Sequence, residues 1–163
     1  MRLRKLEIKD ASFMLEWMHD ADVTQWLGTN FAEKTMDDCL AFIEKNQDDA
    51  ENLNLAIVDD NDEYMGTVSL KHIDKAASNA EFAITIRKCA MGLGVSKFAM
   101  QEIIRIGHEE IGLRDIYWCV SKKNPRARRF YDKNQYLLTD SVPEKIKNNY
   151  SKEQLCDMIW YCA

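Results

Sequence analysis

The chain has 163 residues, of which 46% are hydrophobic and 30% are charged, as in an ordinary globular protein. This length predicts a single domain, residues 1–163, with its own core. No apolar run approaches the roughly 20 residues that cross a membrane. The start, MRLRKLEIKD, lacks an apolar signal core, so we expect a cytoplasmic protein with no membrane partner.

The cysteines and histidines argue against a metal centre. The five cysteines are odd in number and none is spaced C-x-x-C, which disfavours both a disulfide framework and a zinc site. None of the three histidines is paired with an acidic or cysteine residue at metal-ligand spacing. We therefore predict no metal and expect buried free thiols in a reducing compartment.

The net charge of −5 is unevenly distributed. Residues 1–63 hold 16 Asp and Glu against 6 Lys and Arg, whereas residues 64–163 hold 11 against 16. An acidic half suits a cationic partner and a basic half suits a phosphate-bearing one. The alternative is a solvated acidic surface without a ligand.

The N-terminal third reads as a strand followed by two helices. Residues 2–8 form an imperfect strand, and Asp10 precedes a helix in which Trp17 and Met18 recur at core spacing. Residues 22–33 lose periodicity and read as a loop, in which Trp26 and Phe31 either close over a substrate or pin the loop. We favour pinning. Thr35 then caps a helix that runs to about Asn46, with four inward residues: Cys39, Leu40, Phe42 and Ile43.

Three strands follow. Residues 53–58 and 64–70 alternate around the turn Asp59-Asp60-Asn61-Asp62, which predicts an antiparallel hairpin. Residues 80–87 alternate again, with Phe82 on one face and Glu81 on the other.

The stretch 87–112 then passes two glycines, Gly92 and Gly94, and enters a long amphipathic helix that ends at Gly112. Closely spaced glycines at a helix start let backbone N–H groups converge on an anion, and the helix dipole adds partial positive charge. A purely structural turn is the alternative.

The C-terminal third completes a mixed sheet. Residues 116–120 form an uncharged, central strand, and Asn124-Pro125 starts a helix that runs to about Lys133. Residues 136–140 and 156–162 form two more strands, joined by a polar loop at 141–154. The hairpins before the glycine turn, and Lys97 where a third glycine is required, disfavour a Rossmann dinucleotide fold.

Three features together make the sequence resemble the GNAT superfamily of acyl-CoA-dependent N-acyltransferases. The element order matches over nearly the whole chain. The turn CAMGLG at 89–94 corresponds to the family's [Q/R]-x-x-G-x-[G/A] pyrophosphate loop. The segment NPRARRFY at 124–131 resembles its second signature. The sequence departs from the family pattern at two places: Cys89 stands where the family usually has Gln or Arg, and Asn134-Gln135-Tyr136 replaces the common Leu-Gly-Phe. Arg87, Lys88 and Lys97 are near enough in sequence to supply the missing cation.

The resemblance implies an α+β fold with a largely antiparallel seven-stranded sheet, about four helices and two splayed central strands. It also implies acetyl-CoA as cosubstrate. The residues expected to bind it are Ala83, Ile84, Thr85, Ile86, Met91, Gly92, Leu93, Gly94, Val95, Ser96, Asn124 and Arg129. Ordinary strand pairing for 83–87, and simple helix capping for Asn124, stay open as alternatives.

The family's usual chemistry is direct attack by an amine on the thioester. Tyr131 matches the family tyrosine that protonates the leaving sulfur, with an ordinary buried aromatic as the alternative. Glu81 is the candidate base, with a surface strand glutamate as the alternative.

The acceptor is expected to be a small cationic amine, an amino sugar or a peptide N-terminus. Six acidic residues of the first two helices and their loop suggest the cationic character: Glu16, Asp20, Asp22, Glu33, Asp37 and Asp38. A non-catalytic acyl-CoA-binding module is the competing function. The basic cluster at 122–129 is too local to predict a nucleic-acid partner, and a homodimer stays open.

Overall fold

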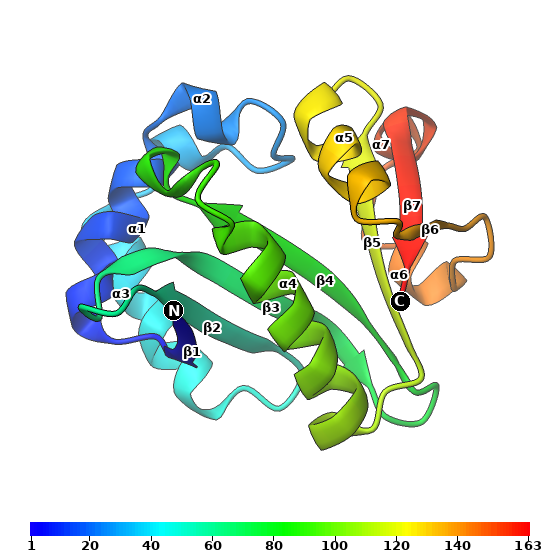
Figure 1. The fold of residues 1–163 in the computed structure, drawn as a ribbon, viewed down its shortest axis with the longest axis horizontal. Coiled ribbons are helices and arrows are strands. Elements are labelled where there is room, and N and C mark those ends of the chain that lie inside the picture. Colours follow the sequence, from blue (N-terminus) through cyan, green and yellow to red (C-terminus); the bar gives the residue numbers. More distant parts are fainter.

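The computed structural model describes residues 1–163, which form one seven-stranded sheet with helices on both faces (Figure 1). The strands lie in the order β1-β2-β3-β4-β5-β7-β6, and every neighbouring pair is antiparallel except β4 and β5. Their bounds are β1 Arg2–Lys5, β2 Leu53–Val58, β3 Tyr64–Asp74, β4 Asn79–Ile86, β5 Asp115–Ser121, β6 Leu137–Leu138 and β7 Met158–Cys162. The predicted α+β class and strand number are confirmed.

Four helices have eight residues or more, in agreement with the predicted number. They are α1 (Ala11–Met18), α3 (Met36–Lys45), α4 (Val95–Arg105) and α5 (Pro125–Lys133). α4 crosses one face of the sheet, and α1 and α3 lie on the other (Figure 1). The two largest cores lie beneath α4, around Phe82 and Met100, and beneath α1 and α3, around Trp17 and Tyr64. No helix combines the length and the apolar character that a membrane crossing requires.

The two predicted loops contain short helices. The segment 22–33 overlaps α2 (Ala21–Thr24), which Asp20 caps by accepting from the Asp22 N–H at 2.9 Å. The segment 141–154 contains α6 (Glu144–Lys147) and the start of α7 (Lys152–Asp157). Helices this short show little periodicity, so the sequence pattern does not distinguish them from loops.

Most of the predicted core residues are buried. Trp17 and Met18 lie in the core, and Phe31 packs edge-on against Trp17, which agrees with the pinning interpretation. The prediction for Phe42 is wrong, because its side chain is 40% exposed. Helix α3 is ten residues long, and its buried positions Cys39 and Ile43 are four apart, so one narrow stripe meets the core.

The central strands β4 and β5 separate, as predicted. They pair in parallel only where Asn79, Ala80 and Glu81 meet Asp115, Ile116 and Tyr117, and beyond these positions they diverge (Figure 1). We call the diverging part, Phe82–Ile86 of β4 and Trp118–Ser121 of β5, the splay. It places an unpaired strand edge in the middle of the sheet.

Candidate active site

The glycine turn leads from β4 into α4 and presents a row of unpaired N–H groups. Gly92 and Gly94 have φ values of 84° and 80°, which glycine adopts without the steric cost of a Cβ. The N–H groups of residues 92–97 have no acceptor within the protein. They lie at the N-terminus of an 11-residue helix, where the backbone dipole favours negative charge. The turn has the geometry of an anion site.

The two cations that precede the turn are already paired. Arg87 is buried and donates to Glu16 at 2.9 and 3.0 Å and to Glu63 at 2.7 Å. Lys88 pairs with Asp22 at 2.5 Å. The expectation that Arg87 and Lys88 replace the missing Gln or Arg is therefore not supported by their contacts. Lys97 is exposed and forms no ion pair, so it remains the cation nearest the turn that has no carboxylate partner.

The edge of β4 at the splay offers backbone groups to a ligand. The Arg87 N–H donates to the Met65 carbonyl, and hydrogen-bonded pairs alternate along antiparallel strands. This alternation directs the peptide groups of Ala83 and Thr85 toward β3. It directs those of Ile84 and Ile86 toward the gap that β5 has left. Two of the four expected β4 residues therefore have peptide groups available at this edge.

A groove of about 560 Å³ lies between α4 and the end of α5. Its lining is mostly polar and consists of Lys97, Gln101, Ile104, Lys133, Asn134, Gln135, Tyr136 and Ala163. The groove begins one helical turn after the glycine turn. The sequence pattern indicated Lys97 and the segment 133–136 but not Gln101, which carries no motif.

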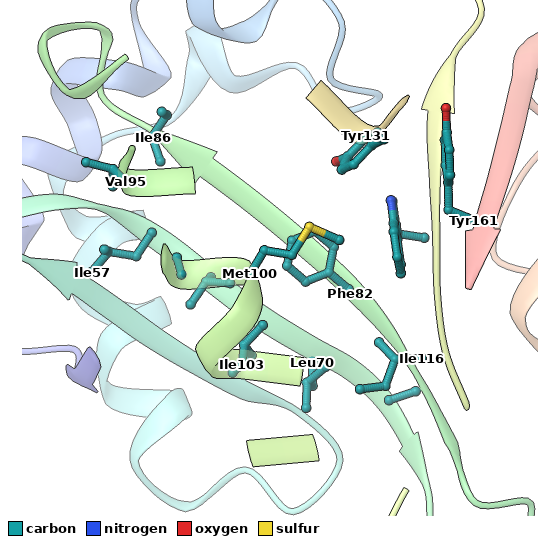
Figure 2. Close-up of a cluster of buried hydrophobic side chains, with 14 of the residues drawn as sticks. Ile57, Leu70, Phe82, Ile86, Val95, Met100, Ile103, Ile116, Tyr131 and Tyr161 are labelled. Carbon is teal, nitrogen blue, oxygen red and sulfur yellow. The ribbon is translucent and has the colours of Figure 1, made fainter. Parts of the chain in front are cut away.

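Tyr131 lies on α5, which begins where Asn124 accepts from the Ala127 N–H at 3.1 Å and Pro125 occupies the first helical position. The ring packs against Trp118 and Tyr161, with centroid distances of 5.7 and 4.9 Å. The hydroxyl bonds to no protein group, and in Figure 2 it lies on the side of the ring that faces β4. Burial raises the pKa of Tyr131 well above its usual value, so the phenol keeps its proton.

Glu81 occupies the last paired position of β4, on the sheet face opposite Phe82. Its side chain is 2% exposed, so it is not a surface strand glutamate. Oε1 accepts from the Tyr150 hydroxyl, with Lys71 Nζ at 3.8 Å. Oε2 has no hydrogen-bond partner, and His72 Nε2 lies 3.9 Å from it. Tyr150 and His72 escaped the sequence analysis, because nothing in the local pattern links them to Glu81.

Two buried side-chain polar atoms have no hydrogen-bond partner, and both belong to residues at the closed end of the splay, on opposite faces of the sheet. They are Glu81 Oε2 and Trp118 Nε1. Glu81 pairs with Tyr117, so Trp118 is the first β5 residue beyond the paired stretch. An unpaired buried polar atom costs about 1–3 kcal/mol, and such sites in native proteins call for an explanation. A ligand that enters the splay would reach these two residues at its closed end.

A family model described as an acetyltransferase (GNAT) domain matches residues 1–136. The chain belongs to the GNAT acetyltransferase family. This match covers both signature segments, the glycine turn and the start of α5, and the observed strand order and splay agree with it.

Individual relatives of this GNAT protein are distant. An uncharacterized N-acetyltransferase, p20, of Bacillus licheniformis is 27% identical over 127 residues, which cover 76% of this chain and 71% of that protein. The acetyltransferase PseH of Campylobacter jejuni is 21% identical over 136 residues, which cover 83% and 82%. Among solved structures, the spermidine N-acetyltransferase of Vibrio cholerae in complex with CoA and spermine has a TM-score of 0.81 at 18% identity, covering 99% and 94%. That likeness concerns the fold.

The acidic side chains of the N-terminal half of this GNAT protein are largely engaged. Glu16 and Asp22 pair with Arg87 and Lys88. Asp20 caps α2, and Asp38 forms a capping box with Thr35 at the start of α3. Four of the six acidic residues that suggested a cationic acceptor therefore have structural partners. The negative field that they direct at an acceptor is weaker than the sequence alone indicated.

Proposed function

We propose that this GNAT protein transfers an acetyl group from acetyl-CoA to a primary amine by direct attack of the amine. One observation carries the proposal: Glu81 and Trp118, the two residues with an unpaired buried polar atom, flank the point where β4 and β5 separate. The gap between β4 and β5 therefore has unpaired polar side chains beside it, as a ligand site would, in the middle of the sheet.

Two backbone segments would hold the cosubstrate. The N–H groups of residues 91–96 would receive the pyrophosphate, since those from Gly92 onward have no protein acceptor. The peptide groups of Ile84 and Ile86 would pair with the pantetheine amides as a further strand would. Ala83 and Thr85 would contribute through their side chains.

The groove between α4 and α5 would take the adenosine end. Lys97 and Lys133 line it and supply positive charge. Asn124 and the exposed Arg129 lie on the same helix as Tyr131 and would contact the phosphates from the α5 side. The Asn124 oxygen already caps α5, which leaves its amide N–H₂ for the ligand.

The chemistry requires a proton acceptor for the amine and a proton donor for the leaving sulfur. Acetyl-CoA, when bound, supplies the thioester carbonyl carbon as the electrophile. Glu81 would accept the amine proton, and Lys71 Nζ lies 3.8 Å from its Oε1. Tyr131 would donate its proton to the sulfur. Its buried phenol stays protonated until a stronger base forms beside it.

The acceptor would be a small cationic amine, an amino sugar or a peptide N-terminus. The fold likeness to a spermidine N-acetyltransferase places polyamines first in a screen. The paired state of Glu16 and Asp22 argues that a high positive charge is not a requirement. Amino sugars and peptides with a free N-terminus belong in the same panel.

The test is turnover with that panel beside calorimetric binding of acetyl-CoA. Product is followed by mass, because the exposed Cys89 and Cys156 would react with thiol-detecting dyes. We expect binding of acetyl-CoA and acetylation of at least one amine class. Binding without acetylation of any amine would support the competing function, a non-catalytic acyl-CoA-binding module. Absence of binding would reject both.

A further inference from the structure

A chain of polar side chains crosses the site on the face opposite α4. Tyr150, between α6 and α7, donates its hydroxyl proton to Glu81 Oε1. The Cys119 thiol of β5 lies near enough to the same hydroxyl to influence its pKa. Cys119 is the second residue of the splay on β5, so the Tyr150 hydroxyl lies beside both a residue of the splay and the carboxylate.

The other end of the chain reaches solvent. Glu81 Oε2 is buried and unpaired, and the imidazole Nε2 of His72 lies 3.9 Å away. The His72 side chain is 44% exposed. One bridging water or a small rotation of this exposed ring closes a gap of that length. The carboxylate thus has one oxygen toward the splay and the other toward a solvent-accessible base.

Burial creates the need for such an arrangement. A proton taken up by Glu81 cannot leave directly to solvent, because the side chain is 2% exposed. It must leave through a neighbouring group before the next turnover. The groups around the carboxylate are Lys71 and His72 from β3, Tyr117 and Cys119 from β5, and Tyr150. Of these, His72 alone combines an exposed side chain with an imidazole, a group that can act as a proton shuttle.

We propose that Tyr150, Glu81 and His72 form a proton pathway from the splay to solvent. This inference rests on the proposed function. As the amine nitrogen bonds to the acetyl carbon and the carbon–sulfur bond breaks, the amine proton passes to the Tyr150 oxygen while the Tyr150 proton passes to Glu81 Oε1. The leaving sulfur takes its proton from Tyr131, which regains one from solvent. The protonated carboxyl group of Glu81 then rotates so that its O–H faces His72 Nε2 and gives this proton to the imidazole, and the imidazolium loses a proton to water. Each group returns to its starting state, and one proton leaves.

The protonation preferences of the neighbours agree with this order. Burial, reinforced by the nearby Cys119 and Glu81, raises the pKa of Tyr150 far above its usual value. The phenol therefore passes a proton on in concert and is not left as a phenolate. Lys71 Nζ lies 3.8 Å from Oε1 and places a positive charge beside the carboxyl group. Tyr150 contacts the reacting amine in this scheme, whereas His72 acts only through Glu81.

The experiment compares His72→Gln with a matched control, His19→Gln. His19 is also exposed, and its imidazole contacts only the Lys34 carbonyl, at 2.8 Å. With the best amine from the panel and a dilute, non-transferring buffer, we expect His72→Gln to lower kcat about tenfold with KM for acetyl-CoA unchanged. Added imidazole should restore the rate, because it replaces the missing carrier. His19→Gln should behave as the wild type in both buffers.

A second variant tests the inner half of the pathway. Tyr150→Phe keeps the ring that packs on Trp160 at 5.5 Å and removes only the hydroxyl. We expect kcat to fall about 100-fold and imidazole to give no rescue. The pathway would be overturned if His72→Gln kept the wild-type kcat at every buffer concentration. It would also be overturned if His72→Gln lost activity that imidazole did not restore. In either case the acetyltransferase assignment would stand. Failure of the wild type to acetylate any amine would overturn both.

Discussion

Arg87 and Glu16 form a two-pronged ion pair that ties α1 to the end of β4. Nε of Arg87 donates to one oxygen of Glu16 at 2.9 Å, and Nη2 donates to the other at 3.0 Å. The same guanidinium donates to the Tyr64 carbonyl and lies 4.3 Å from the centre of the Phe13 ring. The residue directly before the glycine turn is thus fixed from the opposite face of the sheet, and its charge serves the fold.

Replacing Arg87 by Met should destabilise the protein by about 2 kcal/mol, because Glu16, Glu63 and a buried carbonyl lose their shared donor. The estimate is held low because both carboxylates are about half exposed. Urea unfolding measures the change, and Arg126→Met, on the exposed side of α5, is the control. Unchanged stability together with a large loss of acetyl-CoA affinity would instead show that Arg87 binds the cosubstrate.

Gly94→Ala should weaken acetyl-CoA binding, whereas Gly112→Ala should not. Both glycines have φ near +80°, and an added Cβ would touch no other residue at either. Each substitution should therefore cost about 1 kcal/mol of stability through backbone strain alone. Only Gly94 belongs to the turn that presents the N–H groups. Calorimetry should show a higher Kd for Gly94→Ala only, and equal loss of affinity in both variants would refute the assignment of the turn.

Tyr131→Phe should lower kcat about 100-fold and leave the Kd of acetyl-CoA nearly unchanged, because only the proton donor is lost. Tyr136→Phe is a suitable comparison. Its ring also packs on Trp118, at 5.2 Å, and its hydroxyl is given no catalytic role here. Steady-state kinetics on the two variants separates the hydroxyl of Tyr131 from its packing. Similar rates for both would mean that Tyr131 is an ordinary buried aromatic.

The stability of the protein should fall between pH 9 and about 11 because of Cys119. Burial raises the pKa of this thiol from 9.0 to about 11. The unfolded chain therefore releases the proton first, and unfolding becomes more favourable as the pH rises through this window. The expected loss is about 2 kcal/mol. Cys119→Ala should flatten this slope in urea titrations, whereas the exposed Cys89→Ala should keep it. An unchanged slope in Cys119→Ala would contradict the assignment.

The sheet and the helix starts could be predicted from local patterns. Alternation identified β2 within its observed bounds, and Asn124-Pro125 marked the first turn of α5 and so placed Tyr131. Both signals act over a few residues, so one sequence is enough to see them. The same is true of Gly94, because the turn at the start of α4 requires a residue with positive φ.

The environment of Glu81 could not be predicted in this way. Tyr150 contacts it across 69 residues, from a segment whose two helices are too short to show a period. Arg87 pairs with Glu16, which is 71 residues away in the sequence. Because nothing near Arg87 in the sequence indicates this pair, we expected its charge to be free for a phosphate. Contacts of this range depend on the packing of whole elements, and a residue's own neighbours in sequence carry no information about them.

Three residue pairs are all that join β4 to β5, so the sheet is two half-sheets with a short seam. Strands β1 to β4 form one unit and β5 to β7 the other. The halves therefore have the least backbone support against opening along the line where the chemistry would take place. A cosubstrate lying along Ile84 and Ile86 would act as a temporary strand and lock the halves together. The amides of these two residues should then exchange hydrogen far more slowly when acetyl-CoA is bound, so that catalysis and rigidity would come from the same added strand.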